Sequence, residues 1–329
     1  MRILLYMSLL LMLSTCTKTP GKSQNEQPEN IKTVSVPDFN ADSAFLYIKK
    51  QVDFGPRVPN THQHVACANY LKQKLTDFGA QLTVQEADLK AFDGTILKAS
   101  NIIGSYNPEA ATRILLFAHW DTRPWSDHDP DSKNHSTPVS GANDGASGVG
   151  VLLEMARQFG KEKPAVGVDI IFFDAEDYGA PADKMSPENE NSWCLGSQYW
   201  ASNKHIPGYR AKYGILLDMV GAPQARFYRE QISEYYASYV VDLVWKKAAS
   251  LGYAHYFINQ PGGSITDDHL YINQKAGIPS IDIIHYDPNT ATGFGHYWHT
   301  VNDTMENIDK NTLSAVGKTL MQVVYNEQP

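Results

Sequence analysis

The chain has 329 residues, of which 42% are hydrophobic and 11% aromatic, and its formal net charge is -8. This composition is typical of a globular protein with a large hydrophobic core and excludes a disordered or fibrous chain. The acidic balance argues against nucleic acid as a partner, because nucleic-acid-binding surfaces need clustered Lys and Arg. The sequence contains neither GxxxxGK[ST] nor GxGxxG, so it does not indicate a nucleotide site.

Residues 1–16 are interpreted as an export signal. Arg2 supplies a positive charge, residues 3–13 are mostly apolar, and small residues precede Cys16. This arrangement resembles a bacterial lipoprotein signal, in which the cysteine is lipidated; an ordinary secretory signal with an incidental cysteine is the alternative. About a dozen apolar residues are too few for a spanning helix. Residues 17–36 are a polar tether. We therefore expect an exported protein, lipid-anchored and periplasm-facing in a bacterial envelope.

Residues 37–329 are predicted to form one α/β domain. In chain order we expect helices over 42–52 and 62–78, antiparallel strands over 81–89 and 97–105, a strand over 113–118, a helix over 145–159, a strand over 168–173, a helix over 197–203, a strand over 213–217, a helix over 234–251, a strand over 278–284 and a closing helix over 311–325. This alternation indicates a central mixed, mostly parallel sheet flanked by helices on both faces. Two long polar loops, 122–140 and 178–192, follow strands, and loops of this length are often functional.

The strand over 168–173 is apolar almost throughout and is followed by three acids, Asp174, Glu176 and Asp177. A buried strand that delivers carboxylates at its C-terminal end is typical of an active site in an α/β sheet. An acidic surface turn is the alternative for this segment alone. Because Glu176 and Asp177 are adjacent and point in different directions, one can hold a metal while the other transfers protons.

Residues of types that bind metals also occur at the other junctions. They are His119 and Asp121 after the strand over 113–118, Asp144 before the next helix, Asp218 at a strand end, Asp267, Asp268 and His269 in one run, and His299 between Trp and Thr. Each alone has an ordinary alternative, such as a helix cap or a structural histidine. Together they indicate a metal site, and a mixture of imidazole and carboxylate ligands suits Zn²⁺.

In these motifs the chain resembles the zinc-dependent exopeptidase superfamily, and within it the glutaminyl-peptide cyclotransferases (glutaminyl cyclases) of animals and some bacteria. The matching residues are Phe172-Phe173-Asp174-Ala175-Glu176-Asp177, Ile265-Thr266-Asp267-Asp268-His269, Phe294 and Trp298-His299-Thr300. Asp267 favours the cyclases, because aminopeptidases generally have Ser-Asp-His there. The chain departs from the cyclase pattern at Asp177, which is one methylene shorter than the usual Glu.

The resemblance implies cyclisation of the N-terminal Gln of peptides or proteins to pyroglutamate, with release of ammonia; N-terminal Glu is a further substrate that it leaves open. It implies one zinc ion on Asp144, Asp177 and His299. It also implies that Glu176 is the general acid/base and that Asp218 and Asp267 form a supporting carboxyl pair. The implied pocket walls are Trp193, Ile265, Phe294 and Trp298. His119 and Asp121 would serve a second metal or support the first.

Two alternatives remain: a zinc aminopeptidase with one or two metal ions, and a binding protein that has lost catalysis. Two adjacent carboxyl groups share a proton, so an Asp218 engaged by Asp267 is a poor ligand for a second zinc. We therefore expect one ion, although all five positions of a two-zinc site are present. We also expect a monomer, and we do not predict a disulfide between Cys67 and Cys194.

Overall fold

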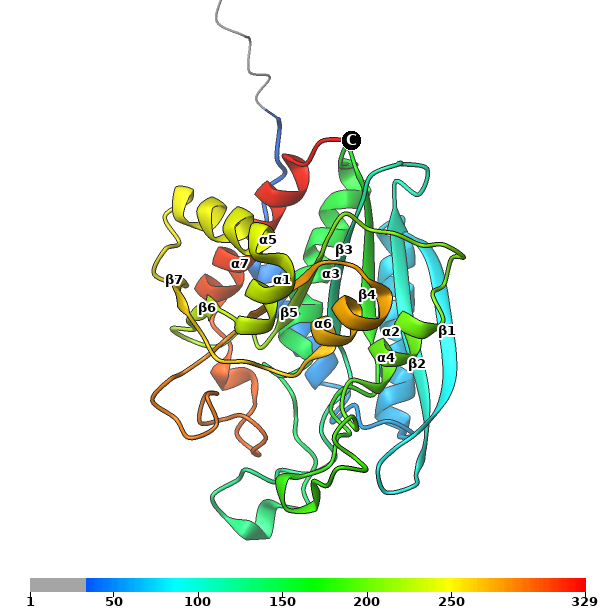
Figure 1. The fold of residues 1–329 in the computed structure, drawn as a ribbon, viewed down its shortest axis with the longest axis vertical. Helices are drawn as coiled ribbons and strands as arrows, with labels where there is room; N and C mark the ends of the chain where they lie inside the picture. The colour runs from blue at the N-terminus through cyan, green and yellow to red at the C-terminus, as the bar shows by residue number, and fades with distance from the viewer. Residues whose placement is uncertain (1–33) are drawn as a thin grey trace, which may run out of the picture. The chain divides into compact units, whose positions relative to one another are not determined.

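The computed structural model describes residues 34–329, so the predicted signal, Cys16 and most of the predicted tether lie outside the described residues. The central sheet has six strands in the order β1-β2-β4-β3-β5-β8 (Figure 1). Their bounds are β1 Gln81–Lys90, β2 Ile96–Tyr106, β3 Arg113–His119, β4 Gly167–Phe173, β5 Gly214–Asp218 and β8 Ser280–Ile284. β1 pairs antiparallel with β2, and β2 with β4, whereas β4, β3, β5 and β8 are parallel to their neighbours. The predicted mixed, mostly parallel sheet is confirmed.

Helices cover both faces of this sheet. They are α1 Ala41–Val52, α2 His62–Asp77, α3 Ala146–Lys161, α4 Leu195–Ser202, α5 Gln231–Ser250, α6 Asp268–Tyr271 and α7 Lys310–Tyr325. Successive strand residues point to opposite faces. On β3, Ile114 and Leu116 pack in the core shared with α1, α2, α3, α5 and α7, whereas Leu115 and Phe117 pack in the core that includes residues of α4. Burial on both faces explains why the central strands are apolar throughout.

The topology places one end of β3 at the point where the strand order reverses. From β3 the chain crosses through α3 to β4 on one side, and later returns to β5 on the other side. In open α/β sheets, ligands bind outside the carboxyl ends of the strands at such a point. β3 and β5 end in His119 and Asp218 there, and residues 174–177 follow β4. The fold thus gathers the predicted site residues at one edge of the sheet.

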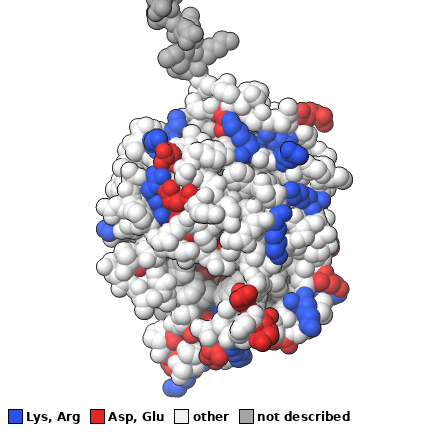
Figure 2. Space-filling model, in the orientation of Figure 1, with Lys and Arg blue, Asp and Glu red and all other residues white. Residues whose placement is uncertain are grey.

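The two long loops extend beyond this edge and run close together in Figure 1. Short 3₁₀ helices interrupt them at Ser132–Asn134 and Ala182–Lys184. On the face of the molecule drawn in Figure 2, acidic side chains gather at the lower end, where these loops lie in Figure 1. Over the upper part of that face, basic and acidic side chains are interspersed.

Several short elements were not predicted from the sequence. They are β6 Phe227–Arg229 and β7 Phe257–Pro261, which form a separate two-stranded parallel sheet, a π-helix at Ile272–Ala276 and three short 3₁₀ helices. Most predicted boundaries hold within about two residues. The start of α5 differs more, because the side chain of Glu230 caps the helix three residues earlier than predicted. Within residues 34–329, no helix has the length and apolarity needed to cross a membrane.

Candidate metal and active site

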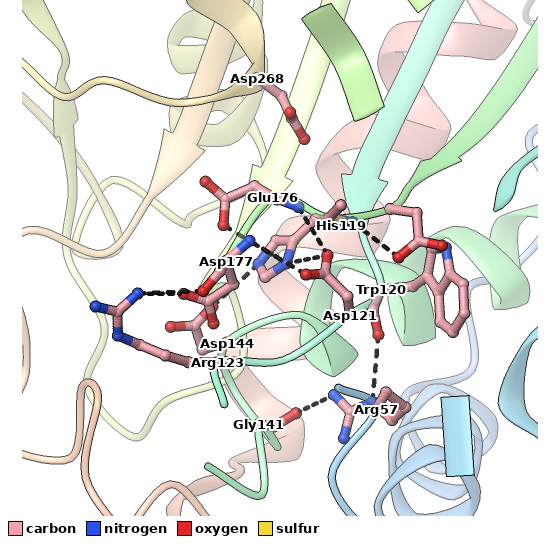
Figure 3. Close-up of polar contacts among 12 residues, drawn as sticks. Arg57, His119, Trp120, Asp121, Arg123, Gly141, Asp144, Glu176, Asp177 and Asp268 are labelled. Carbon is pink, nitrogen blue, oxygen red and sulfur yellow. Dashed lines mark hydrogen bonds and ion pairs between the residues drawn. The ribbon is translucent and has the colours of Figure 1, made fainter. Parts of the chain in front are cut away.

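Two buried aspartates fix the backbone at the segments that carry the acids. The Asp121 carboxylate accepts hydrogen bonds from the amides of Glu176 and Asp177, at 3.0 and 3.2 Å (Figure 3). The Asp303 carboxylate likewise accepts from the amides of Asn143 and Asp144, at 2.8 and 3.0 Å. Each aspartate therefore orients one of the predicted zinc ligands through its backbone.

The site also concentrates unusual backbone conformations. Seven non-glycine residues of the described chain have positive φ, and four of them lie at the site: Ala175, Cys194, Met219 and His299. Such conformations cost free energy and persist only where the surrounding structure enforces them. Ala175, at φ 52°, lies two residues after the end of β4 and directly before Glu176 and Asp177. The turn at Ala175 brings Glu176 and Asp177 over the end of the sheet.

Asp144, Asp177 and His299 are close enough to bind one metal ion. Their ligand atoms lie within 4.8 Å of one another and the three residues are buried. His299 Nε2 lies 3.3 Å from an Asp177 carboxylate oxygen and 3.6 Å from one of Asp144. Both carboxylate oxygens of Asp177 are buried without a hydrogen-bond partner. Since unpaired buried carboxylates are costly, this group fits a cation, and its nitrogen and oxygen donors suit Zn²⁺.

Burial and neighbouring charges shift the pKa values of two residues in this group. Burial raises the pKa of Asp177 well above its ordinary value, and repulsion by Asp144 adds to the increase. Burial lowers the pKa of His299 well below its ordinary value, and the positive charge of Arg123 acts in the same direction. His299 is therefore a neutral imidazole, which is the form that binds metals.

A second group that could hold a metal shares Asp144 with the first. It consists of His119, Asp144 and Asp218, all buried. His119 Nε2 lies 3.0 Å from an oxygen of Asp144 and 3.2 Å from one of Asp218. Burial opposes the charge of His119, but hydrogen bonds to the surrounding aspartates outweigh it and raise its pKa well above its ordinary value. His119 therefore links these carboxylates by charge-assisted hydrogen bonds.

Glu176 is not a member of the first metal group. Its Oε1 lies 3.1 Å from Cys194 Sγ, and Glu176, Cys194 and Asp267 form a further close cluster. Burial, together with repulsion by Asp267 and Asp177, outweighs the attraction of His119 and raises the pKa of Glu176 well above its ordinary value. A carboxyl group with a raised pKa is suited to general acid/base catalysis near neutral pH.

Most of the predicted site residues line one small cavity of about 180 Å³. It brings together Asp144, Glu176, Trp193, Asp218, Ile265, Asp267, Phe294, Trp298 and His299, with Met219, Thr266 and Ile284. A typical ligand pocket is roughly 300–1,000 Å³, so this cavity suits a single side chain rather than a larger molecule. A larger cavity of about 550 Å³ lies between the two long loops, but neither Glu176 nor Asp267 lines it.

The predicted site residues thus converge, and one of them, Asp267, has an additional role. Asp267 also caps α6 through the amide of Asp268, as the capping alternative anticipated. Its pKa is raised well above its ordinary value by burial and by repulsion from Asp218, which lines the same cavity. Asp144 does not cap α3, because Gly145 occupies that position. His119, Asp121 and Asp177 are not among the residues that line the cavity.

Sequence reasoning missed four residues that support the site: Arg57, Arg123, Cys194 and Asp303. Arg57 is fully buried and donates to the carbonyls of Trp120, Ser140 and Gly141, which fixes the loop before α3 (Figure 3). The arginines and Asp303 belong to none of the sequence motifs described above. Cys194 and Cys67 are both free and buried.

Comparison with known proteins agrees with this geometry. The chain is 60% identical to Bacteroides thetaiotaomicron glutaminyl cyclase, whose crystal structure bound to N-acetylhistamine superimposes with a TM-score of 0.88 and covers 89% of this chain and 100% of that one. It is 28% identical over 258 residues to the glutaminyl-peptide cyclotransferase of Bos taurus, and 28% identical over 298 residues to aminopeptidase YwaD of Bacillus subtilis.

These two alignments cover 68% and 87% of this chain, and they span 65% and 57% of the length of the bovine and Bacillus proteins. The model of peptidase family M28 matches residues 101–324. This range includes β3, α3, β4 and β5, and it includes every residue of the two metal groups. The chain therefore belongs to peptidase family M28.

Proposed function

We propose that the protein cyclises the N-terminal Gln of peptides and proteins to pyroglutamate and releases ammonia, using one zinc ion on Asp144, Asp177 and His299. The observation that carries this proposal is that Asp267 shares the small cavity with Glu176 and Asp218. The resemblance to cyclases rather than aminopeptidases depends on an acid at this position. The 60% identity to the glutaminyl cyclase of B. thetaiotaomicron supports the same reaction.

When bound, the zinc ion supplies Lewis acidity to the γ-carbonyl of the substrate Gln. Glu176 accepts a proton from the α-ammonium group, so that the amine can attack the γ-carbonyl carbon. A carbon–nitrogen bond forms in the five-membered ring, and the bond to the amide nitrogen breaks. Glu176 then returns a proton to that nitrogen, which leaves as ammonia, and accepts the second proton that the ring nitrogen loses as the lactam forms. Its raised pKa suits these proton transfers.

The cavity walls have a separate task. Trp193, Ile265, Phe294 and Trp298 would hold the side chain of the substrate in the folded conformation that ring closure requires. The rings of Phe294 and Trp298 lie 4.7 Å apart, and Trp298 stacks on His299 at 3.7 Å. These apolar surfaces also exclude water, which would otherwise compete with the amine as the nucleophile.

A zinc aminopeptidase is the second candidate, because His119, Asp144 and Asp218 form a second group that could hold a metal. In that reaction Glu176 would take a proton from water instead of an amine. We favour one ion for two reasons. His119 Nε2 is within hydrogen-bond distance of both Asp144 and Asp218. In addition, Asp267 lines the same cavity as Asp218 and repels its charge. A single zinc per chain in metal analysis of the purified protein is the expected result.

The two reactions give different products from the same peptide. We expect the zinc-loaded protein to release ammonia from a Gln-peptide, to lose this activity on chelation and to regain it when zinc is added. Ammonia can be followed with a coupled enzymatic assay while free Gln is measured by chromatography. Free Gln without ammonia would establish the aminopeptidase instead. If a folded, zinc-loaded sample forms neither product, the remaining alternative is a binding protein that has lost catalysis.

We also propose that the chain is exported, anchored through lipid on Cys16 and faces the periplasm as a monomer on a polar tether. The support is the sequence of residues 1–36 alone. Cells that express the full chain should incorporate labelled palmitate into it, and Cys16→Ser should abolish the label and release the protein from membranes. Label retained by Cys16→Ser would contradict the proposal.

A further inference from the structure

Arg123 is a fully buried arginine whose guanidinium group contacts both long loops. Its Nε and Nη2 each donate to one carboxylate oxygen of Asp127, both at 2.6 Å. Its Nη1 donates to the carbonyl oxygens of Asp177 and Gly179, at 3.1 and 3.3 Å. Figure 3 shows this side chain reaching Asp177 beside Asp144. Arg123 therefore binds the backbone directly at one of the proposed zinc ligands.

The same guanidinium group packs against a wall of the substrate cavity. Its carbon Cζ lies 4.5 Å from the ring centroid of Trp193, in cation–π contact. The absence of a side chain at Gly179 leaves room for the indole of Trp193, because a Cβ atom at Gly179 would lie 2.0 Å from that ring. Trp193 also lies nearly parallel to His299, with 7° between the ring planes. The position of Trp193 thus depends on Arg123, Gly179 and His299.

Asp127 extends this set of contacts to the third proposed zinc ligand. One of its carboxylate oxygens lies 3.7 Å from Nδ1 of His299, whereas Nε2 of the same ring faces Asp144 and Asp177. The buried Nδ1 has no hydrogen-bond partner among the described residues. In metal sites, a carboxylate facing the second ring nitrogen fixes the orientation and tautomer of the ligand. Asp127 is placed for this role, although at 3.7 Å its contact with Nδ1 is electrostatic and not a hydrogen bond.

We propose that Arg123 and Asp127 act together as positioning residues that set the zinc affinity of His299 and Asp177 and the place of Trp193. The inference rests on the zinc site of the proposed function. A buried ion pair by itself contributes little to stability, because desolvation offsets the attraction. Here the pair makes directed contacts to a ligand ring, a ligand backbone and a cavity wall, so its effect should appear at the site.

The chain offers a matched control at the other end of the sheet. Arg113 Nε and Nη2 donate to the two carboxylate oxygens of Asp169, both at 2.7 Å, in the same two-pronged geometry. Arg113 begins β3, and its ion pair lies away from the residues that line the cavity. Arg123→Lys and Arg113→Lys each keep a positive charge and lose the planar fork. A general cost of disturbing a buried pair would therefore appear in both variants.

The test measures zinc affinity by competition with a chromogenic chelator, which requires no catalytic turnover. We expect Arg123→Lys and Asp127→Asn each to weaken zinc binding roughly 10- to 100-fold, and Arg113→Lys to bind zinc as the wild type does. Comparison with Trp193→Phe identifies the part of the tryptophan fluorescence emission that comes from Trp193. We expect the spectrum of that part to shift in Arg123→Lys. Asp127→Asn is isosteric and tests the inference if Arg123→Lys does not fold.

The outcomes separate this inference from the proposed function. Wild-type affinity for zinc in both site variants would overturn the inference while leaving the proposed function intact. An equal loss of affinity in Arg113→Lys would also overturn it, because the effect would then be a general one. A wild-type protein that does not bind zinc would instead overturn the metal assignment on which both proposals depend.

Discussion

The thiol of Cys194 donates a hydrogen bond to Glu176, with Sγ 3.1 Å from Oε1. Burial raises the pKa of this thiol well above its ordinary value, so it remains protonated as a donor. Its own backbone amide donates to the carbonyl of Glu176 at 2.9 Å, which joins the two segments a second time. Cys194 therefore holds one oxygen of the proposed general base, and the other lies 3.9 Å from His119 Nδ1.

Removal of this donor should slow catalysis without loss of zinc. We expect Cys194→Ala to lower kcat by about fivefold, the effect of a hydrogen bond of roughly 1 kcal/mol, and Cys194→Ser to retain most activity because a hydroxyl donates in its place. Cys67→Ala, in the hydrophobic core, is the control for the loss of a buried thiol. Equal kcat in Cys194→Ala and the wild type would show that the thiol does not orient the base.

Glu176 should be needed for proton transfer and not for metal binding. It is not part of the metal group formed by Asp144, Asp177 and His299. We expect Glu176→Gln to reduce kcat by at least about 10²-fold while the protein still binds one zinc per chain. Metal analysis beside the kinetic assay decides the point, because loss of zinc in this variant would make Glu176 a ligand.

Asp267 should determine both the reaction and the number of metal ions. Asp267→Ser introduces the residue typical of aminopeptidases and relieves the repulsion between Asp267 and Asp218. We expect it to impair cyclisation and to let His119 and Asp218 share a second zinc with Asp144. The zinc content of the variant, measured in excess metal, should exceed that of the wild type. An unaffected rate of cyclisation would remove Asp267 from the mechanism.

Glu230 should make the stability of the fold sensitive to acid. Its carboxylate accepts from the amides of Ile232, Ser233 and Ile265 and faces His269 Nε2 at 3.1 Å. Burial opposes its ionisation, but the hydrogen bond with His269 and those from the amides outweigh burial and lower its pKa from 4.5 to about 2. The folded protein therefore favours the ionised form.

Because the pKa is lower in the folded state, this stabilisation is present above about pH 4.5 and is lost as the pH falls towards 2. We expect Glu230→Gln to lower the free energy of unfolding at neutral pH by on the order of 3 kcal/mol. The difference between the variant and the wild type should shrink as the pH falls through this window. Urea unfolding at a series of pH values measures it, and a constant difference would contradict the assignment.

The fold class and the main site residues could be predicted because they leave local signals. The apolar run of β4 and the acids that follow it are adjacent in the sequence, and parallel strands bring their carboxyl ends to one edge. Arg123 and Asp303 leave no such signal. Arg123 contacts Asp177, which is 54 positions away in the sequence, and Asp303 contacts Asp144, which is 159 positions away. No local sequence pattern specifies contacts between residues so far apart. The early start of α5 was missed because a Glu cap is uncommon.

The most direct test of the central claim is mass spectrometry of a short Gln-peptide after incubation with the zinc-loaded protein. The proposed chemistry predicts a product lighter by one ammonia and otherwise intact, formed by the wild type and not by Glu176→Gln. A product that has lost the whole N-terminal Gln residue would contradict cyclisation and identify the protein as an aminopeptidase.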